Sequence, residues 1–74
     1  MYHLYGTEGC HLCELALEIC INGLGKDSFT EVDIIDDKNL VELYGIHIPV
    51  LENTKTGTKL YWPFSEQDLD KIKN

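Results

Sequence analysis

The sequence predicts an α/β domain in which helices cover both faces of a four-stranded mixed sheet. Two observations support this prediction. Segments with the two-residue period of strands alternate with segments of helical period, in the order β-α-β-α-β-β-α. A β-α-β start favours two parallel strands, and a hairpin later in the chain adds antiparallel neighbours. With a length of 74 residues, we expect residues 1–74 to form a single domain.

Composition narrows the classes of function. The chain is 43% hydrophobic and 26% charged, which is typical of a globular protein. Its formal net charge is −7, and its six basic residues are all Lys. A nucleic-acid binder needs clustered positive charge, so we expect no nucleic-acid partner. No apolar run approaches the roughly 20 residues of a membrane span, and we find no secretory signal. Three cysteines are too few for a secreted disulfide scaffold. We therefore expect a cytoplasmic protein that does not bind membranes.

The first strand and the first helix are predicted on either side of a short loop. Residues 2–5 are rich in aromatic side chains and are bounded by Gly6, which is typical of a strand. From Cys10 onward the period becomes helical, and Gly23 and Gly25 can end the helix. The apolar face of this helix comprises Cys13, Ala16, Leu17, Cys20, Ile21 and Leu24.

The second strand and the second helix follow directly. Residues 29–35 alternate with a period of two, which predicts a strand. Asp36 or Asp37 can cap the helix that follows by accepting a backbone N–H bond, and Gly45 can end it. Its predicted buried face comprises Leu40, Val41 and Tyr44.

The last third of the chain predicts a hairpin and a closing helix. Residues 49–52 form the third strand, with a proline at its first position, where no ladder donor is needed. Residues 53–57 form the loop, and residues 58–62 return as the fourth strand. Ser65 followed by Asp68 has the spacing of a capping box, so a helix is predicted to begin there. Leu69 and Ile72 give this helix an apolar seam.

The motif with the clearest chemistry is Cys10-x-x-Cys13, placed where the first strand leads into the first helix. Cysteines three residues apart in one helical turn can form a disulfide, and in a β-α-β context this spacing indicates a redox pair. The positive end of the helix dipole favours a thiolate at Cys10, and the thiolate is the nucleophile of disulfide exchange. We therefore predict that Cys10 is the exposed attacking thiol and that Cys13 is the buried resolving thiol.

Other interpretations of the cysteine motif and its neighbours remain open. His11 adds positive charge beside Cys10 when protonated, or it is an exposed residue without a role. Glu8 and Glu14 lie close in sequence and disfavour a thiolate. The same thiols could also bind Zn²⁺ or Cu⁺, with His11 or thiols of a partner. His3 and His47 could join the two cysteines as ligands of a Cys₂His₂ zinc site. The simpler interpretation is that each histidine faces solvent or forms hydrogen bonds within the protein.

Beyond the motif, three groups of residues have simpler structural explanations. Cys20 lies two helical turns after Cys13, beyond disulfide reach, and is predicted to be a core residue. Trp62 and Phe64 are predicted to close the core over the last helix, since so small a core needs large side chains. Capping explains the acidic residues after the second strand more simply than a magnesium site does: Asp33, Asp36 and Asp37.

The chain resembles the thioredoxin-fold superfamily, and most closely the short glutaredoxin-like proteins with a C-x-L-C active site. Residues 4–14, 32–34 and 46–51 and the closing helix carry the resemblance, which covers nearly the whole chain. It implies the strand order 2-1-3-4. It also implies that Pro49 is cis and lies beside the cysteine motif, and that the backbone of Ile48 faces the bound substrate. With His11 and Leu12, these two residues form the expected substrate-binding set.

The family also implies glutathione as a co-substrate, but the chain departs from the pattern that binds it. Glutaredoxins that use glutathione commonly carry a basic residue near the motif, a Thr-Val-Pro triplet and a Gly-Gly turn. Here the matching stretches are Thr7-Glu8, His47-Ile48-Pro49 and residues 62–65, and there is no Arg to clamp a carboxylate. These departures argue for disulfides of proteins rather than for glutathione.

We therefore expect a monomeric thiol–disulfide oxidoreductase with Cys10 and Cys13 as its catalytic residues. We expect no cofactor or resident metal beyond the reversible Cys10–Cys13 disulfide. Its partners would be a disulfide-containing protein or a small-molecule thiol, together with a reductase. Two alternatives remain: a metal-binding or metal-delivery module that uses the same thiols, and a non-enzymatic adaptor with the same fold.

Overall fold

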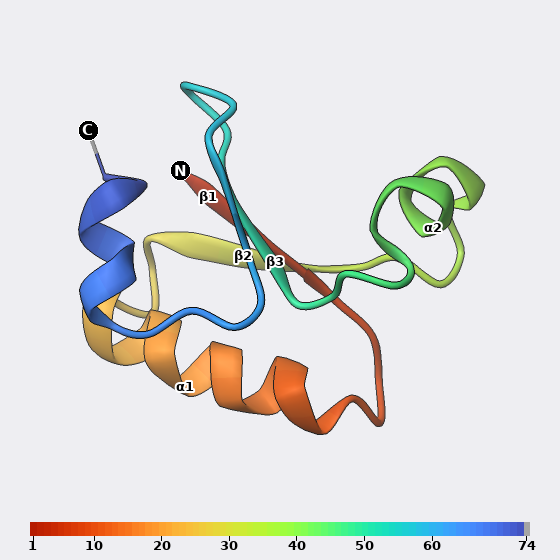
Figure 1. Cartoon of the computed structure of the whole chain (residues 1–74), viewed down its shortest axis with the longest axis horizontal. Coiled ribbons are helices and arrows are strands. Elements are labelled where there is room, and N and C mark those ends of the chain that lie inside the picture. The colour runs from red at the N-terminus through yellow and green to blue at the C-terminus, as the bar shows by residue number, and fades with distance from the viewer. Residues whose placement is uncertain (74) are drawn as a thin grey trace.

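The structure is a computed structural model that describes residues 1–73. The elements follow the predicted order (Figure 1). They are β1 (Tyr2–Gly6), α1 (His11–Leu24), β2 (Phe29–Asp33), α2 (Lys38–Tyr44), β3 (Val50–Asn53), β4 (Lys59–Tyr61) and a 3₁₀ helix, η1 (Gln67–Lys71). None of the helices within residues 1–73 has the length and the apolar character needed to cross a bilayer.

The four strands form one mixed sheet in the order β2-β1-β3-β4, which confirms the predicted topology. β1 pairs with β2 in parallel and with β3 antiparallel, and β3 pairs with β4 antiparallel. Because β1 is interior, its residues 2–5 have partners on both sides, and Gly6 pairs only with Asp33 of β2. Leu4, for example, lies opposite Glu31 of β2 and Leu51 of β3. The C-terminal end of β1 therefore places the loop that follows it near the middle of that end of the sheet.

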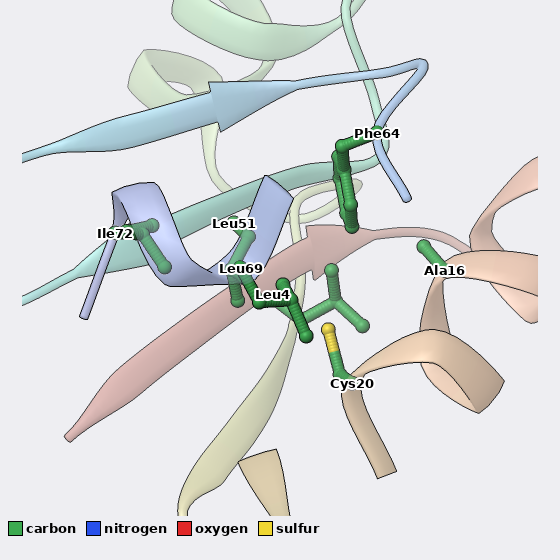
Figure 2. Packing of buried hydrophobic residues seen from close by; sticks show 7 residues of the cluster. All are labelled: Leu4, Ala16, Cys20, Leu51, Phe64, Leu69 and Ile72. Atoms are coloured by element: carbon green, nitrogen blue, oxygen red, sulfur yellow. The ribbon is translucent and has the colours of Figure 1, made fainter. Parts of the chain in front are cut away.

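The larger part of the core lies between the sheet and the pair α1 and η1, which lie side by side on one face (Figure 1). Leu69 of η1 packs directly on the α1 backbone at Gly23, where a Cβ atom would collide with it. Cys20 is completely buried in this cluster, and Phe64 is nearly so, which confirms both as core residues. Figure 2 shows the buried cluster: Leu4, Ala16, Cys20, Leu51, Phe64, Leu69 and Ile72.

The opposite face of the sheet packs against α2. Tyr5 stacks on Tyr44 with ring centroids 4.7 Å apart, and the Tyr5 hydroxyl donates a 2.6 Å hydrogen bond to Glu52. The prediction that Val41 is buried is wrong, because this residue is 39% exposed. α2 is only two turns long, so its buried stripe is limited to the i, i+4 pair Leu40 and Tyr44.

The ends of the helices follow the predicted caps with one exception. Asp37 caps α2 by accepting bonds from the N–H groups of Asn39 and Leu40. At the closing helix, Asp68 accepts bonds from the N–H and hydroxyl groups of Ser65, so only the carboxylate half of the capping box forms. The Asp68 amide bonds instead to the carbonyl of Ser65, which gives a 3₁₀ turn with its cap one residue later than predicted.

Several strand boundaries also differ from the predicted ranges by one or two residues. β2 ends at Asp33 rather than at residue 35, and β3 begins at Val50 rather than at Pro49. β4 is limited to three residues at the outer edge of the sheet.

Candidate active site

The two cysteines of the motif meet at the start of α1. Cys10 is the N-cap residue and Cys13 lies in the first turn, with their Cα atoms 5.2 Å apart and their sulfur atoms joined in a disulfide. Cys10 Sγ also accepts a 3.1 Å hydrogen bond from the backbone N–H of Cys13. A sulfur that caps a helix in this way meets the positive end of the helix dipole. The helix N-terminus therefore favours negative charge on Cys10 once the disulfide is reduced, and the nearby carboxylates of Glu8 and Glu14 oppose it.

The exposure of the two residues differs from the prediction. Cys10 is half-buried rather than exposed, and Cys13 is half-buried rather than part of the core. The core face of α1 begins one turn later, at Ala16. In the first turn, Cys13 lies against Gly6 at the end of β1 and is not part of the packed cluster. The predicted split between an exposed and a buried thiol is therefore not seen in the disulfide form.

Gly6, the last residue of β1, makes room for the pair. A Cβ atom at this position would lie 2.9 Å from Cys13 Sγ and 3.2 Å from Cys13 Cβ. Any side chain would therefore push against the disulfide. From the sequence, Gly6 could be assigned only to the end of a strand. Its position a few residues before the cysteine motif was the one feature of the sequence that could have indicated this contact, because the motif packs back on the strand.

A pocket of about 640 Å³ opens beside the disulfide, between α1 and the edge strand β2. Cys10 and Cys13 are both part of its wall. The remaining wall comes from β1, the loop after it, α1 and β2: Leu4, Gly6, Thr7, Glu8, Gly9, Glu14, Leu17, Glu31, Val32 and Asp33. The site thus combines a disulfide with an adjoining hollow.

The expected substrate-binding residues lie on other sides of the pair. His11 and Leu12 are exposed in the first turn of α1, and Leu12 is 45% exposed. Ile48 is half-buried and Pro49 is buried, and the peptide bond between them is cis. β3 runs antiparallel to β1 and pairs Val50 with Tyr5, so the cis-proline loop lies at the same end of the sheet as the cysteine motif. These four residues do not line the pocket.

The two remaining histidines each contact a tyrosine. His3 is half-buried, with Nδ1 3.4 Å from the Tyr5 hydroxyl, on the α2 face of the sheet. The exposed ring of His47 packs against Tyr61 with centroids 5.4 Å apart. Over residues 1–73, His, Cys, Asp and Glu side chains form no group of three or more placed to hold a metal ion.

Cys20, the third cysteine, does not take part in this site. It is a free thiol with no exposed surface, and burial raises its pKa to about 11. At neutral pH it is therefore protonated and shielded, which suits a packing role and not disulfide exchange.

Comparison with known proteins matches this fold and site. The family model described as the glutaredoxin-like domain (DUF836) matches residues 2–72. No curated protein matches the chain. The X-ray structure of the Northeast Structural Genomics target protein XcR50 from X. campestris is 35% identical, covers 96% of this chain and 92% of its own, and superposes with a TM-score of 0.84. The solution structure of the same target is 36% identical, with coverages of 95% and 87% and a TM-score of 0.80. The chain belongs to the glutaredoxin-like (DUF836) family.

Proposed function

We propose that the protein is a thiol–disulfide oxidoreductase that uses Cys10 and Cys13 as its redox pair. The observation that carries the proposal is the disulfide between these residues at the N-terminus of α1, with both residues in the wall of a pocket. A glutaredoxin-like fold with this pair is consistent with redox chemistry. Exchange requires a sulfur that is reachable and stabilised as a thiolate, and the capping position of Cys10 supplies that stabilisation.

The proposed reaction starts from the reduced pair. The Cys10 thiolate attacks one sulfur of a substrate disulfide, forming a mixed disulfide and releasing the other sulfur as a thiolate that takes a proton from water. The Cys13 thiol loses its proton and attacks Cys10 Sγ, which releases the second substrate thiol. The substrate disulfide gains two electrons and two protons, and the protein is left with the Cys10–Cys13 disulfide. A low-molecular-weight thiol or a disulfide reductase returns the pair to the reduced form.

The remaining predicted residues have supporting roles in this proposal. His11 and Leu12 present exposed side chains next to Cys10, where an approaching substrate would contact them. Ile48 and Pro49 stand at the same end of the sheet and offer backbone to an extended segment of a substrate. Their roles are tested by the same assay as the cysteines, with Leu12→Ala expected to raise KM more than it lowers kcat.

The decisive experiment measures reduction of hydroxyethyl disulfide and of insulin, with dithiothreitol as the electron source. Wild type and a Cys20→Ala control should both be active, because Cys20 is buried in the core. Cys10→Ser should reduce neither disulfide above the uncatalysed rate. Reduced Cys13→Ser, freed of dithiothreitol and then mixed with hydroxyethyl disulfide, should accumulate a mixed disulfide at Cys10, visible as a mass increase that added dithiothreitol removes. An inactive wild type, or a Cys10→Ser variant as active as wild type, would rule out the proposal.

A further inference from the structure

The pocket beside the redox pair carries charge of only one sign. Four carboxylates belong to its wall, one from the loop, one from α1 and two from β2: Glu8, Glu14, Glu31 and Asp33. Among residues 1–73, no Lys side chain belongs to this wall, and the sequence contains no Arg. None of the four carboxylates forms an ion pair in that range, because the ion pairs there lie near the C-terminal end of the chain. Their charges are therefore not neutralised by the protein.

The sheet register explains why the two β2 carboxylates face this hollow. Glu31 pairs with Leu4 and Asp33 pairs with Gly6, and side chains directly opposite each other on paired strands share a face. Leu4 belongs to the core beneath α1, and Gly6 lies against Cys13. Glu31 and Asp33 thus extend this face of the sheet outward past β1, on the side of α1. Asp33 is further oriented by a 3.0 Å bond that its Oδ1 accepts from the N–H of Ile35.

A disulfide that approaches Cys10 through this hollow meets the field of those carboxylates. Clefts lined by charge of one sign concentrate ligands of the opposite sign and raise association rates by roughly 10- to 1,000-fold, an effect that salt weakens. An anionic disulfide is repelled by the same field. Leu4 and Leu17 supply apolar side chains to the wall, which suits a short aliphatic chain between the charge and the sulfur, whereas the Val32 side chain packs on the opposite face of the sheet.

We infer that the site selects disulfides that carry positive charge close to their sulfur atoms, and that Glu31 and Asp33 set this preference. This inference rests on the proposed oxidoreductase function and names its substrate class. The disulfide and the pocket beside it define the site. The carboxylates of the pocket wall determine that a positively charged substrate is favoured over a negatively charged one. The substrate class comprises disulfides of small amines and disulfides flanked by Lys or Arg in a peptide. Glutathione disulfide, which is anionic, belongs to the disfavoured class. Exchange proceeds by the two-electron steps given above.

The test compares kcat/KM for small disulfides that differ in charge: cystamine (cationic), hydroxyethyl disulfide (neutral) and dithiodiglycolate (anionic). At low ionic strength, cystamine should exceed dithiodiglycolate by about tenfold or more. The ratio should shrink toward one as salt is added. A second series of peptide disulfides, flanked by Lys or by Glu, distinguishes a protein source of the cationic substrate from a small amine. A preference for the cationic member in either series supports the inference.

Two matched double variants assign the preference to residues. E31Q/D33N removes two charges from the pocket, and the Asn side chain can keep the bond to the N–H of Ile35. E18Q/E42Q removes the same charge from exposed residues outside the pocket wall. The first variant should reduce the cystamine to dithiodiglycolate ratio severalfold, and the second should leave it nearly unchanged. Circular dichroism confirms that both are folded.

The failures of the two proposals are distinguishable. If wild type reduces all three small disulfides, and both peptides, with equal kcat/KM at low salt, the charge preference is refuted and the oxidoreductase function stands. The assignment to Glu31 and Asp33 is refuted if E18Q/E42Q lowers the ratio as much as E31Q/D33N does. If wild type reduces no disulfide, including the neutral one, the oxidoreductase function is refuted and the charge preference falls with it.

Discussion

Replacing Gly6 with alanine would place a methyl group against the Cys13 side chain. The added Cβ would lie 2.9 Å from Cys13 Sγ and 3.2 Å from Cys13 Cβ. Relaxed contacts between carbon atoms lie near about 3.5–4.0 Å, so the Cys13 side chain must retreat by roughly 0.3–1 Å. While Cys13 is bonded to Cys10, it can retreat only by moving the disulfide and the first turn of α1 with it. Overpacking of this kind costs about 1–3 kcal/mol.

The cost should depend on the redox state. In the reduced protein the Cys13 side chain can rotate away, so Gly6→Ala should destabilise the oxidised form more than the reduced form. A difference of about 1 kcal/mol would raise the reduction potential by about 20 mV, since 30 mV corresponds to about 1.4 kcal/mol for a two-electron couple. The backbone at Gly6 is outside the positive-φ region, so the effect would come from the contact alone.

The assay is urea denaturation of the oxidised and reduced proteins, together with a redox titration against dithiothreitol. Gly57→Ala is the control, because Gly57 has a φ of 79° and nothing within 4 Å of an added Cβ. Its backbone strain, about 1–2 kcal/mol, should be the same in both redox states. Equal destabilisation of the two forms by Gly6→Ala, or none at all, would refute the account of this contact.

Three further predictions concern stability. Burial raises the pKa of Cys20 from 9.0 to about 11, so the folded protein keeps this thiol neutral at pH values where the unfolded chain ionises it. The free energy of unfolding that depends on the neutral thiol is therefore fully present below pH 9 and is lost as the pH rises toward 11. Urea denaturation of the oxidised protein should show wild type losing up to about 2–3 kcal/mol over this range that Cys20→Ala does not lose; parallel curves would contradict this. Asp37→Ala should cost about 1 kcal/mol by removing the α2 cap, whereas Asp37→Asn should cost little; equal losses measured by thermal denaturation would contradict the cap. Tyr5→Phe should cost about 1.5–3 kcal/mol in urea, because it removes a hydrogen bond to the Glu52 carboxylate, and Tyr61→Phe is the exposed control. A Tyr5→Phe variant as stable as this control would show that the bond contributes nothing.

Much of the fold could be predicted from local pattern alone. The helical spacing of Ala16, Leu17, Cys20 and Leu24 was visible because one side of α1 packs in the core, although Ile21, predicted on the same face, is 40% exposed. The strand at residues 29–33 was also predicted, but its two apolar residues pack on opposite faces of the sheet, Phe29 toward α1 and Val32 toward α2. The Asp37 cap was also predictable, since capping depends on atoms two or three residues apart. The extent of burial on α2 was not, because whether Val41 meets the sheet depends on the length and placement of that helix.

The candidate site divides in the same way. The Cys10–Cys13 pair follows from spacing within one helical turn. The role of Gly6 depends on how α1 packs back on β1, and the role of Glu31 depends on which strand lies at the edge beside α1. Both are contacts between elements distant in sequence, and no periodicity along the chain records them. The half-burial of Cys13 likewise depends on how close the first turn lies to the sheet.

The position of β2 as an outer strand has a consequence for self-association. Outer strands carry unpaired backbone groups that can recruit another strand, and charged side chains are one common protection against this. β2 exposes Glu31 and Asp33 along its length. Two copies joined through antiparallel β2 strands centred on Glu31 would place this carboxylate opposite its own copy, and like charges in that position are destabilising. The same carboxylates that face the redox pair thus make this edge a poor template for sheet extension.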